Sequence, residues 1–364
     1  MEIVKSSRLV SLATVLVITL ASSLYGEVYV NRLWDDGTGS FKVMALNLEG
    51  ESLTLDRFYQ NEYGDSNHLE PGPPFIFEEA VNILSIRDGN GDVVEEGWSS
   101  LTIRNDQPNP SKPFTLTFSG NIYDAFNENS IFIDGLLAVE GQAFDKVRFE
   151  GRYRMRSNAD QFSVTGTENR YEITFKHADF SGAGSTSSPM VFQGGHVSFE
   201  DCLLKNLSGY PEAVLASFQN DLTFEPQWSF TMRDCDVQNN RMQSDRVVYV
   251  QYAAKTTLED NRFANNDVGS YLYPNLVELD RCGITRIDDN TAGTNRVNAF
   301  RLNTCFADTT SYIQTSSDLP LLVTLLRVDP DHVLTIDKGS VLKFYSYEGG
   351  LKNQGTLSVT GSVL

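Results

Sequence analysis

The chain has 364 residues, a hydrophobic content of 40% and a formal net charge of −19. This composition excludes a disordered chain, and the length suits one large or two ordinary domains. Because so acidic a chain is repelled by phosphate backbones and anionic lipid surfaces, we expect no nucleic-acid partner, and polyanionic glycans are disfavoured unless a local basic groove overrides the overall charge.

Residues 1–26 have the pattern of a secretory signal peptide. Lys5 and Arg8 form a positively charged start, and the apolar run from Leu9 to Leu24 follows, with small residues after it. The alternative is an uncleaved anchor, although the run is short for a membrane span. The pattern predicts an exported protein that is secreted, in the outer membrane or at the cell surface, with no membrane insertion of the mature segment.

Residues 27–110 show no clear periodicity, so we expect an irregular entry region that caps the rest of the chain. The stretch "FIFEEAVNILSI", from Phe75 to Ile86, fits a short helix running into a strand. "DGNGD", from Asp88 to Asp92, resembles part of a calcium loop but lacks the remaining ligands, so we interpret it as a turn.

An internal repeat organises the rest of the chain. Its template is apolar-x-apolar-x-x-Cys/Asn-x-apolar, as in "FEDCLLKN" and "MRDCDVQNN". Clear copies begin at Val197, Phe230, Thr256, Val277 and Phe300, and looser ones begin at Leu116, Val147 and Ile173. Such a repeat predicts a solenoid, because each copy supplies a short strand that buries its inner face only by stacking on its neighbours.

Strand alternation then predicts which side chains point inward. One apolar column is expected to contain Phe199, Met232, Leu258, Leu279 and Leu302. The next inward column is expected to contain Leu204, Val237, Phe263, Ile284 and Ala307. The longer step between the copies at Val197 and Phe230 predicts a projecting loop over Ser208 to Trp228.

The repeat copies resemble coils of right-handed parallel β-helix proteins, and they are most similar to passengers of the polymorphic outer-membrane and autotransporter-like type. "WDDGTGSFKVMALN", "VLTIDKGSVLKF" and "LKNQGTLSVTGSVL" are similar to further segments of such proteins. The resemblance implies an all-β, right-handed parallel β-helix over residues 111–364. It also implies a non-catalytic adhesive or structural role, with an extracellular glycan or a surface protein as partner.

The sequence stops at Leu364 inside an alternating strand. A solenoid needs its last apolar coil covered, so we expect a continuation or a cap beyond this residue.

The cysteines and asparagines of the repeat are predicted to be architectural. Four cysteines and Asn261 share one template position, which predicts a structural ladder rather than disulfides or a reactive thiol. These cysteines are Cys202, Cys235, Cys282 and Cys305. A second position holds Asn206, Asn239 and Asn265. Their amides are expected to stack along the axis, or their backbone to form a left-handed corner.

No metal or cofactor is predicted. The four histidines do not lie at ligand spacing, and no Cys-x-x-Cys occurs.

Charged residues next to the Cys/Asn position form the remaining candidate site. On a β-helix they face outward, which favours a solvated face. The alternative is a polysaccharide lyase or glycoside hydrolase, in which such residues serve as acid, base or ligands of calcium, the only case in which a cofactor would be expected. The candidates are Asp201, Arg233, Asp234, Asp260 and Arg281.

Overall fold

A computed structural model of the chain consists of stacked parallel strands, and its described part contains no helix. The described residues are 27–35, 40–56, 75–77, 81–89, 93–94, 97–105, 113–118, 130–151, 153–158, 171–182, 188–209, 212–218, 228–269, 274–345 and 350–361. The predicted signal segment and the end of the "DGNGD" turn lie outside them. The prediction of an all-β parallel solenoid is confirmed.

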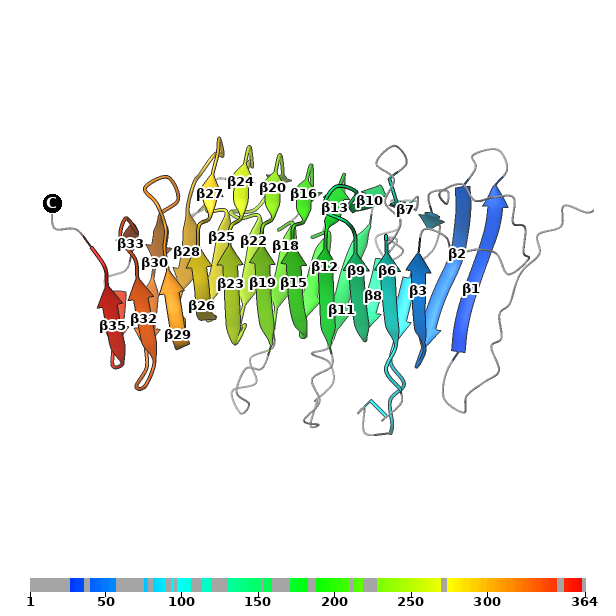
Figure 1. The fold of residues 1–364 in the computed structure, drawn as a ribbon, viewed down its shortest axis with the longest axis horizontal. Coiled ribbons are helices and arrows are strands. Elements are labelled where there is room, and N and C mark those ends of the chain that lie inside the picture. Colours follow the sequence, from blue (N-terminus) through cyan, green and yellow to red (C-terminus); the bar gives the residue numbers. More distant parts are fainter. Residues whose placement is uncertain are drawn as a thin grey trace, which may run out of the picture.

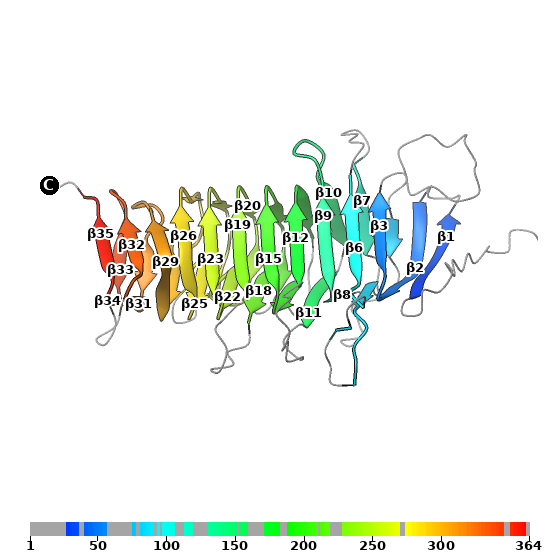
Figure 2. The same cartoon turned by 60° about the horizontal axis from the view of Figure 1, so that its bottom comes forward.

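Each coil places strands on three faces, and equivalent strands of successive coils lie side by side along the long axis (Figures 1 and 2). Face 1 contains the second half of β2 (Ser40–Glu49), then β5 (Val81–Leu84), β8 (Ser130–Asp134), β11 (Arg154–Asn158), β14 (Met190–Gln193), β18 (Val214–Ser217), β22 (Val248–Gln251), β25 (Val277–Asp280), β28 (Phe300–Asn303), β30 (Leu321–Val323) and β33 (Leu342–Phe344).

Face 2 follows face 1 in each coil. It contains β3 (Ser52–Asp56), β6 (Ser100–Arg104), β9 (Leu136–Glu140), β12 (Glu172–Lys176), β15 (His196–Glu200), β19 (Ser229–Arg233), β23 (Lys255–Glu259), β26 (Gly283–Asp288) and β29 (Cys305–Ile313). After β29 it divides into β31 (Leu325–Val328) with β34 (Gly350–Asn353), and β32 (Val333–Ile336) with β35 (Thr356–Val359).

Face 3 completes the coil. It contains the first half of β2, then β4 (Phe75–Phe77), β7 (Thr115–Phe118), β10 (Val147–Gly151), β13 (Ala178–Ser181), β16 (Leu203–Lys205), β20 (Asp236–Gln238), β24 (Arg262–Ala264) and β27 (Thr291–Ala292). Two short strands, β17 (Ser208–Gly209) and β21 (Arg241–Met242), pair beside this face.

Parallel stacking begins within the region that was expected to be irregular. β1 (Glu27–Asp35) pairs antiparallel with β2, and β2 already pairs in parallel with β4 and β5. The described parts of Phe75–Ile86 form these two strands and no helix. The wall of the solenoid therefore starts well before residue 111.

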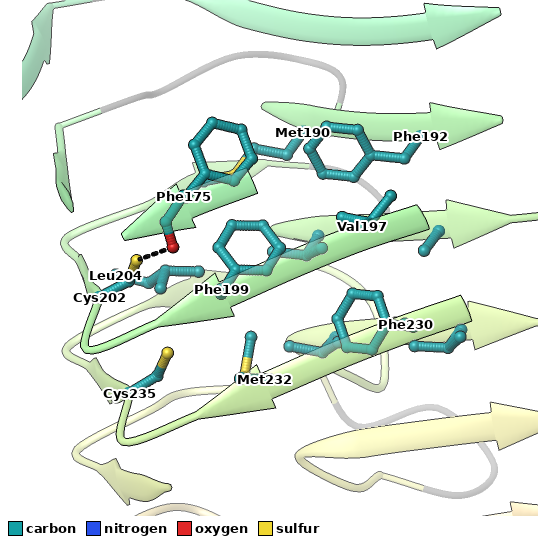
Figure 3. Close-up of a cluster of buried hydrophobic side chains, with 14 of the residues drawn as sticks. Phe175, Met190, Phe192, Val197, Phe199, Cys202, Leu204, Phe230, Met232 and Cys235 are labelled. Carbon is teal, nitrogen blue, oxygen red and sulfur yellow. Dashed lines mark hydrogen bonds between the residues drawn. The ribbon is translucent and has the colours of Figure 1, made fainter. Parts of the chain in front are cut away.

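Alternation along each strand sends every second side chain into one continuous apolar core. Figure 3 shows phenylalanines from three successive coils of face 2: Phe175 and Phe199 lie in one column, which Met232 continues, and Phe230 lies in the next column, in register with Val197. The rings of Phe175 and Phe199 stack with centroids 4.9 Å apart, and all three phenylalanine side chains are buried. Burying a side chain of this size contributes about 1.5–3 kcal/mol, so the stacked columns provide the main driving force for folding.

The predicted inward residues are all buried, but they form different columns from those expected. Met232 and Leu258 continue to Ile287 on face 2, whereas Leu279 and Leu302 stack on Val250 in face 1. In the same way Ile284 and Ala307 belong to face 2, and Leu204, Val237 and Phe263 belong to face 3. The copies at Val277 and Phe300 are therefore strands of another face.

Left-handed corner residues end the strands of all three faces. Corners after face 2 are formed by His177, Asp201, Asp234, Asp260 and Asp289. Corners after face 3 are formed by Gly182, Asn206, Asn239 and Asn265, and corners after face 1 by Tyr252, Arg281 and Thr304. Positive φ is costly for most L-residues and is best tolerated by Gly, Asn and Asp, which explains the composition of the first two sets.

The number of residues per coil varies, whereas equivalent strands stay paired from one coil to the next. Leu53 pairs with Leu101 and Ile173 pairs with Val197, although the first connection is twice as long as the second. The described part of the predicted loop at 208–228 includes β18, which lies in face 1, and residues 219–227 lie outside the described part. In the ranges that the structure describes, no helix is long and apolar enough to cross a membrane.

Candidate functional site

The three candidate aspartates occupy equivalent corners of successive coils. Asp201, Asp234 and Asp260 each follow the last residue of a face 2 strand and have φ values of 46°, 52° and 55°. Asp and Asn side chains stabilise such a corner through local hydrogen bonding, so a backbone requirement accounts for these residues.

The five candidates do not converge on one site. Arg281 forms the corner after β25 on face 1, where its guanidinium lies over the ring of Tyr252, 5.2 Å from the centroid. Arg233 lies on the outer surface of β19 in face 2 and its Nε is 3.0 Å from Oε2 of Glu259. The repeat template aligned the copy that begins at Val277 with strands of face 2, but this copy is β25 of face 1. Arg281 was therefore grouped with charged residues that lie on another face.

Asp201 has a specific environment at its corner. Its Oδ1 accepts a hydrogen bond from Nζ of Lys146 at 2.5 Å, and its Oδ2 accepts one from Nδ1 of His177 at 2.7 Å. Partial burial acts to raise the pKa of Asp201, but the two hydrogen bonds outweigh it and leave the pKa below its ordinary value. The cluster joins three segments of chain and stabilises their packing.

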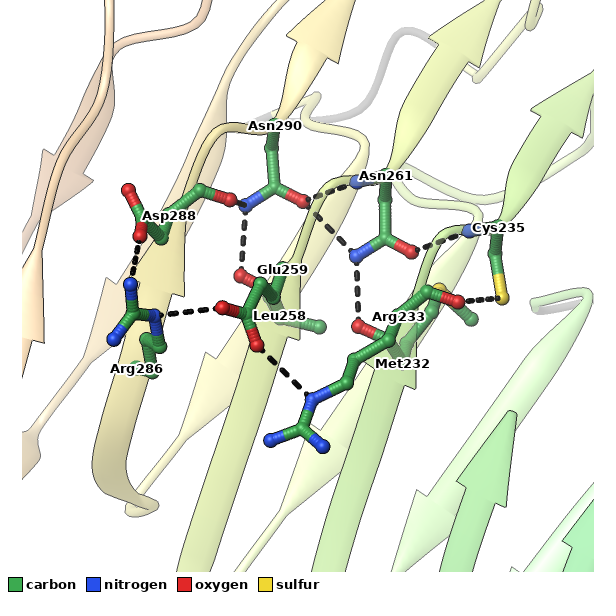
Figure 4. Close-up of polar contacts among 9 residues, drawn as sticks. All are labelled: Met232, Arg233, Cys235, Leu258, Glu259, Asn261, Arg286, Asp288 and Asn290. Atoms are coloured by element: carbon green, nitrogen blue, oxygen red, sulfur yellow. Dashed lines mark hydrogen bonds and ion pairs between the residues drawn. The ribbon is translucent and has the colours of Figure 1, made fainter. Parts of the chain in front are cut away.

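Outward side chains on face 2 form a column of alternating charge. Strand pairing places one charged residue per coil at the same position, and the sign changes at every step. We call the following set the charge column: Arg104, Glu140, Lys176, Glu200, Arg233 and Glu259. Its members form three ion pairs: Arg104 with Glu140 at 2.7 Å, Lys176 with Glu200 at 2.7 Å, and Arg233 with Glu259 at 3.0 Å. At its end, Glu259 also binds Arg286, which contacts Asp288 (Figure 4).

A second column on the same face carries hydroxyl groups. On β6 to β23 it lies two residues before the charge column, and six strand pairings align it from β3 to β23. We call the following set the hydroxyl column: Thr54, Thr102, Ala138, Thr174, Ser198, Thr231 and Thr257. Ala138 is its one member without a hydroxyl. Equivalent atoms of neighbouring strands lie ~4.8 Å apart, so the column has a regular spacing along the axis.

Aromatic residues gather where the strands of face 2 begin, and the repeat template gave no sign of them. Trp98, Tyr171 and Trp228 precede β6, β12 and β19, and His196 opens β15. We call these four residues the aromatic corner. Tyr171 lies edge-on to Trp98 at 4.9 Å and to Trp228 at 6.0 Å, and His196 lies edge-on to Trp228 at 5.7 Å.

The ring of Tyr171 is fixed by polar contacts. Its hydroxyl donates to Oδ1 of Asp134 at 3.0 Å and accepts from Arg87, which also binds Asp134 at 2.5 Å. Burial and the neighbouring carboxylate raise the pKa of Tyr171, so the phenol stays protonated. Gly135, next to Asp134, packs closely against the neighbouring coil, because a Cβ at this position would come within 2.4 Å of the carbonyl oxygen of Ser99. The ring of Tyr171 is therefore held in place, and Trp98 and Trp228 lie against it.

A buried charge network on face 1 was also missed. Arg246 binds Oε1 of Glu212 at 2.9 Å and Oε2 of Glu278 at 2.5 Å, and Arg301 lies 3.5 Å from Glu278. The side chains of Glu212 and Glu278 are only 1% and 5% exposed. Burial raises the pKa of Glu212, although Arg246 opposes the shift. These residues come from four coils, so no local pattern could reveal the network.

The cysteines are free and buried, as the ladder prediction requires, but they lie in two columns. Cys202 and Cys235 precede Asn261 and Asn290 at the corner after face 2. Cys282 and Cys305 follow β25 and β28 on face 1. Burial raises the pKa of Cys282 to about 12 and also raises that of Cys235 and Cys305, so these thiols stay protonated.

Cysteine and asparagine perform the same task in these columns. The amide nitrogen of Asn261 donates to the carbonyl oxygen of Met232 in the preceding coil at 2.8 Å (Figure 4). The thiol of Cys202 donates in the same way to the carbonyl oxygen of Phe175, at 3.3 Å (Figure 3). Asn261 in addition accepts from the backbone nitrogen of Cys235 and donates to Asn290. Cys282 and Cys305 also donate to carbonyl oxygens of the preceding coil, whereas Cys235 donates to the carbonyl oxygen of Arg233 in its own coil.

The second asparagine ladder lies one residue beyond its predicted position. Asn206, Asn239 and Asn265 are exposed corner residues with positive φ, which is the alternative given for them. The amides that stack are those of Asn240 and Asn266, which are buried, and of Asn295, which is half-buried. The amide nitrogen of Asn240 donates to Oδ1 of Asn266 and that of Asn266 donates to Oδ1 of Asn295, both at 3.0 Å. The Oδ1 of each of the three also accepts from a backbone nitrogen one coil back.

Metal ligands and known relatives give no further lead. Among the described residues no group of three or more His, Cys, Asp or Glu side chains is placed to hold a metal ion. No protein family, no curated protein and no solved structure matches the chain. The inference of function therefore depends on the residues of the solenoid.

Proposed function

We propose that the chain is an exported or cell-surface β-solenoid passenger with a non-catalytic adhesive or structural role. The observation that carries the proposal is the placement of the five candidate catalytic residues. Three of them form equivalent backbone corners, Arg233 belongs to an ion-paired column and Arg281 lies on another face. Catalysis needs groups that converge on one substrate atom, whereas these groups repeat from coil to coil.

The architecture also supports this role. A wall of hydrogen-bonded coils around one core is a stiff rod, and its outer faces present the same chemistry over many coils. Under the proposal the rod needs no cofactor, and its partner is an extracellular glycan or a surface protein. Export would come from residues 1–26.

The proposal is tested with the purified chain and a panel of pectic, alginate and neutral glycans. Reducing ends and the absorbance of unsaturated products are followed with and without calcium. We expect no turnover. Turnover that is lost in folded Asp234→Asn or Arg233→Ala variants would establish the polysaccharide lyase or hydrolase alternative instead.

Localisation needs its own measurement. Antibody labelling of intact source cells and blotting of their culture medium should find the chain at the surface or outside. Finding it only after lysis, inaccessible to added protease, would contradict the proposal.

A further inference from the structure

We propose that face 2 and the aromatic corner together bind an uncharged linear polysaccharide that lies along the axis of the solenoid. This inference rests on the proposed adhesive role and gives that role a site and a ligand class. Three features run parallel on one side of the molecule: the hydroxyl column, the charge column and the aromatic corner. The two columns lie on strands that are drawn side by side in Figures 1 and 2, and the residues of the aromatic corner precede or open strands of the same face.

The charges of the face select a neutral ligand. The chain as a whole carries −19, but the six members of the charge column are three cationic and three anionic side chains, which offset one another. Strand pairing continues this position to Asp56 at one end and to Asp288 at the other, where Arg286 contacts Asp288. The six members are already ion-paired with one another, so a ligand does not have to neutralise them. Their exposed N–H groups and carboxylate oxygens remain able to hydrogen-bond with sugar hydroxyls. A polyanion would instead meet the repulsion of the acidic molecule.

The hydroxyl column supplies a regular set of polar contacts. A hydroxyl both donates and accepts, and so does each hydroxyl of a sugar. From β3 to β19 each coil except that of Ala138 offers such a group from a threonine or serine, at multiples of ~4.8 Å, and Thr257 on β23 is buried. A linear polysaccharide also presents its hydroxyls at constant intervals, so successive coils can contact successive sugar units. The repeating face therefore fits a repeating polymer better than a compact ligand.

The aromatic corner supplies apolar contact along one edge of the face. Trp98 and Trp228 are partly exposed, and both are held edge-on against Tyr171. A rigid aromatic ring offers a large contact area and loses little conformational entropy on binding. Sugar rings have apolar C–H faces as well as hydroxyls, so a ligand in contact with both the tryptophans and the hydroxyl column satisfies both kinds of group.

The experiment uses the full chain and isothermal titration calorimetry. The neutral probes are cellohexaose, xylohexaose and mannohexaose, and hexagalacturonate is the anionic comparator. We expect at least one neutral hexamer to bind and hexagalacturonate to bind more weakly. Trp228→Ala, which removes a central aromatic contact, should weaken binding about tenfold.

Two further variants separate a binding role from a folding role. Thr231→Val removes one hydroxyl of the column at constant shape and should weaken binding without lowering the unfolding temperature. Phe132→Ala removes an exposed aromatic ring from face 1 and should leave binding unchanged. The inference is overturned if no neutral hexamer binds, if hexagalacturonate binds more tightly, or if Phe132→Ala weakens binding as much as Trp228→Ala does. Self-association that is abolished by Trp228→Ala would also overturn it, because face 2 would then be an interface between copies.

The outcome also distinguishes this inference from the proposed function. Binding without shortened products supports both. Binding with cleavage of the hexamer supports the site but overturns the non-catalytic role. Absence of binding and of cleavage overturns the site alone.

Discussion

At the scale of single residues, the corners decide which side chains the chain can accept. Asp234 is exposed and has a φ of 52°, a conformation that costs most L-residues roughly 1–2 kcal/mol and costs Asn and Asp less. Its role is therefore set by its backbone rather than by a ligand.

Asp234→Val should lower the free energy of unfolding by about 1–2 kcal/mol, because a β-branched residue is strained in this region. Asp234→Asn should leave it unchanged. Urea denaturation measures both, and Thr231→Val, at an extended position on the same strand, should be neutral. Equal losses in all three variants would contradict the corner explanation.

Arg246 is the residue on which the buried charge network depends. Arg246→Met leaves the carboxylates of Glu212 and Glu278 buried without a full partner, which should cost about 3–5 kcal/mol of stability. The exposed pair of Arg262 and Asp236 is the control, and Arg262→Met should cost about 0–1 kcal/mol. Similar losses in the two variants would show that burial does not govern these ion pairs.

Asp201 makes stability depend on pH. Its folded pKa lies below 3.8, so its interactions with Lys146 and His177 contribute fully above pH 3.8 and are lost as the pH falls through the folded pKa. The difference in urea midpoint between wild type and Asp201→Asn should therefore shrink as the pH is lowered from 5 to 3. A difference that stays constant over this range would refute the linkage.

At the scale of elements, the repeat template predicted the strands and their corners but not the face to which each belongs. On faces 1 and 2 a left-handed corner residue is followed by a small buried side chain, so Val277 and Val197 fit one template from different faces. The ladder position was missed by one residue because Asn239 and Asn240 are adjacent and sequence does not show which is buried. Strand pairing resolves both ambiguities.

The adjacent asparagines Asn265 and Asn266 allow a matched test of the ladder. Asn266→Gly removes the acceptor of the Asn240 backbone nitrogen, and each buried polar group left unsatisfied costs about 1–3 kcal/mol. Asn265→Gly keeps a residue that adopts positive φ freely and should change stability little. Thermal unfolding compares the two, and a larger loss in Asn265→Gly would place the ladder at the other residue.

At the scale of the whole molecule, the all-β solenoid was predictable because the repeat reports on stacking directly. The aromatic corner and the buried charge network were not. Trp98, Tyr171 and Trp228 meet because they precede equivalent strands of face 2, and the connections between those strands differ in length and carry no pattern. Contacts between distant coils therefore need the structure.

Stability should decrease toward the last coil. Leu342, Leu351 and Leu357 are only partly buried there, whereas the inward residues of β19 are fully buried. In a solenoid each coil is stabilised by its neighbours, so amides of β33 to β35 should exchange with solvent faster than those of β19. Hydrogen exchange followed by mass spectrometry measures this, and uniform protection along the rod would contradict it.

Equivalent strands stay paired from coil to coil although the connections between them differ in length, and this affects how such a chain can change over evolution. A segment inserted into a connection leaves the ladders and the core columns on either side intact, because their contacts are made between equivalent residues of adjacent coils. Insertions and deletions in the longer connections between strands are therefore tolerated where point changes at the corners and inward positions are not. Homologous chains would then differ more in length than in the chemistry of their inward positions, and a reporter peptide placed between Phe218 and Trp228 should leave the rod folded.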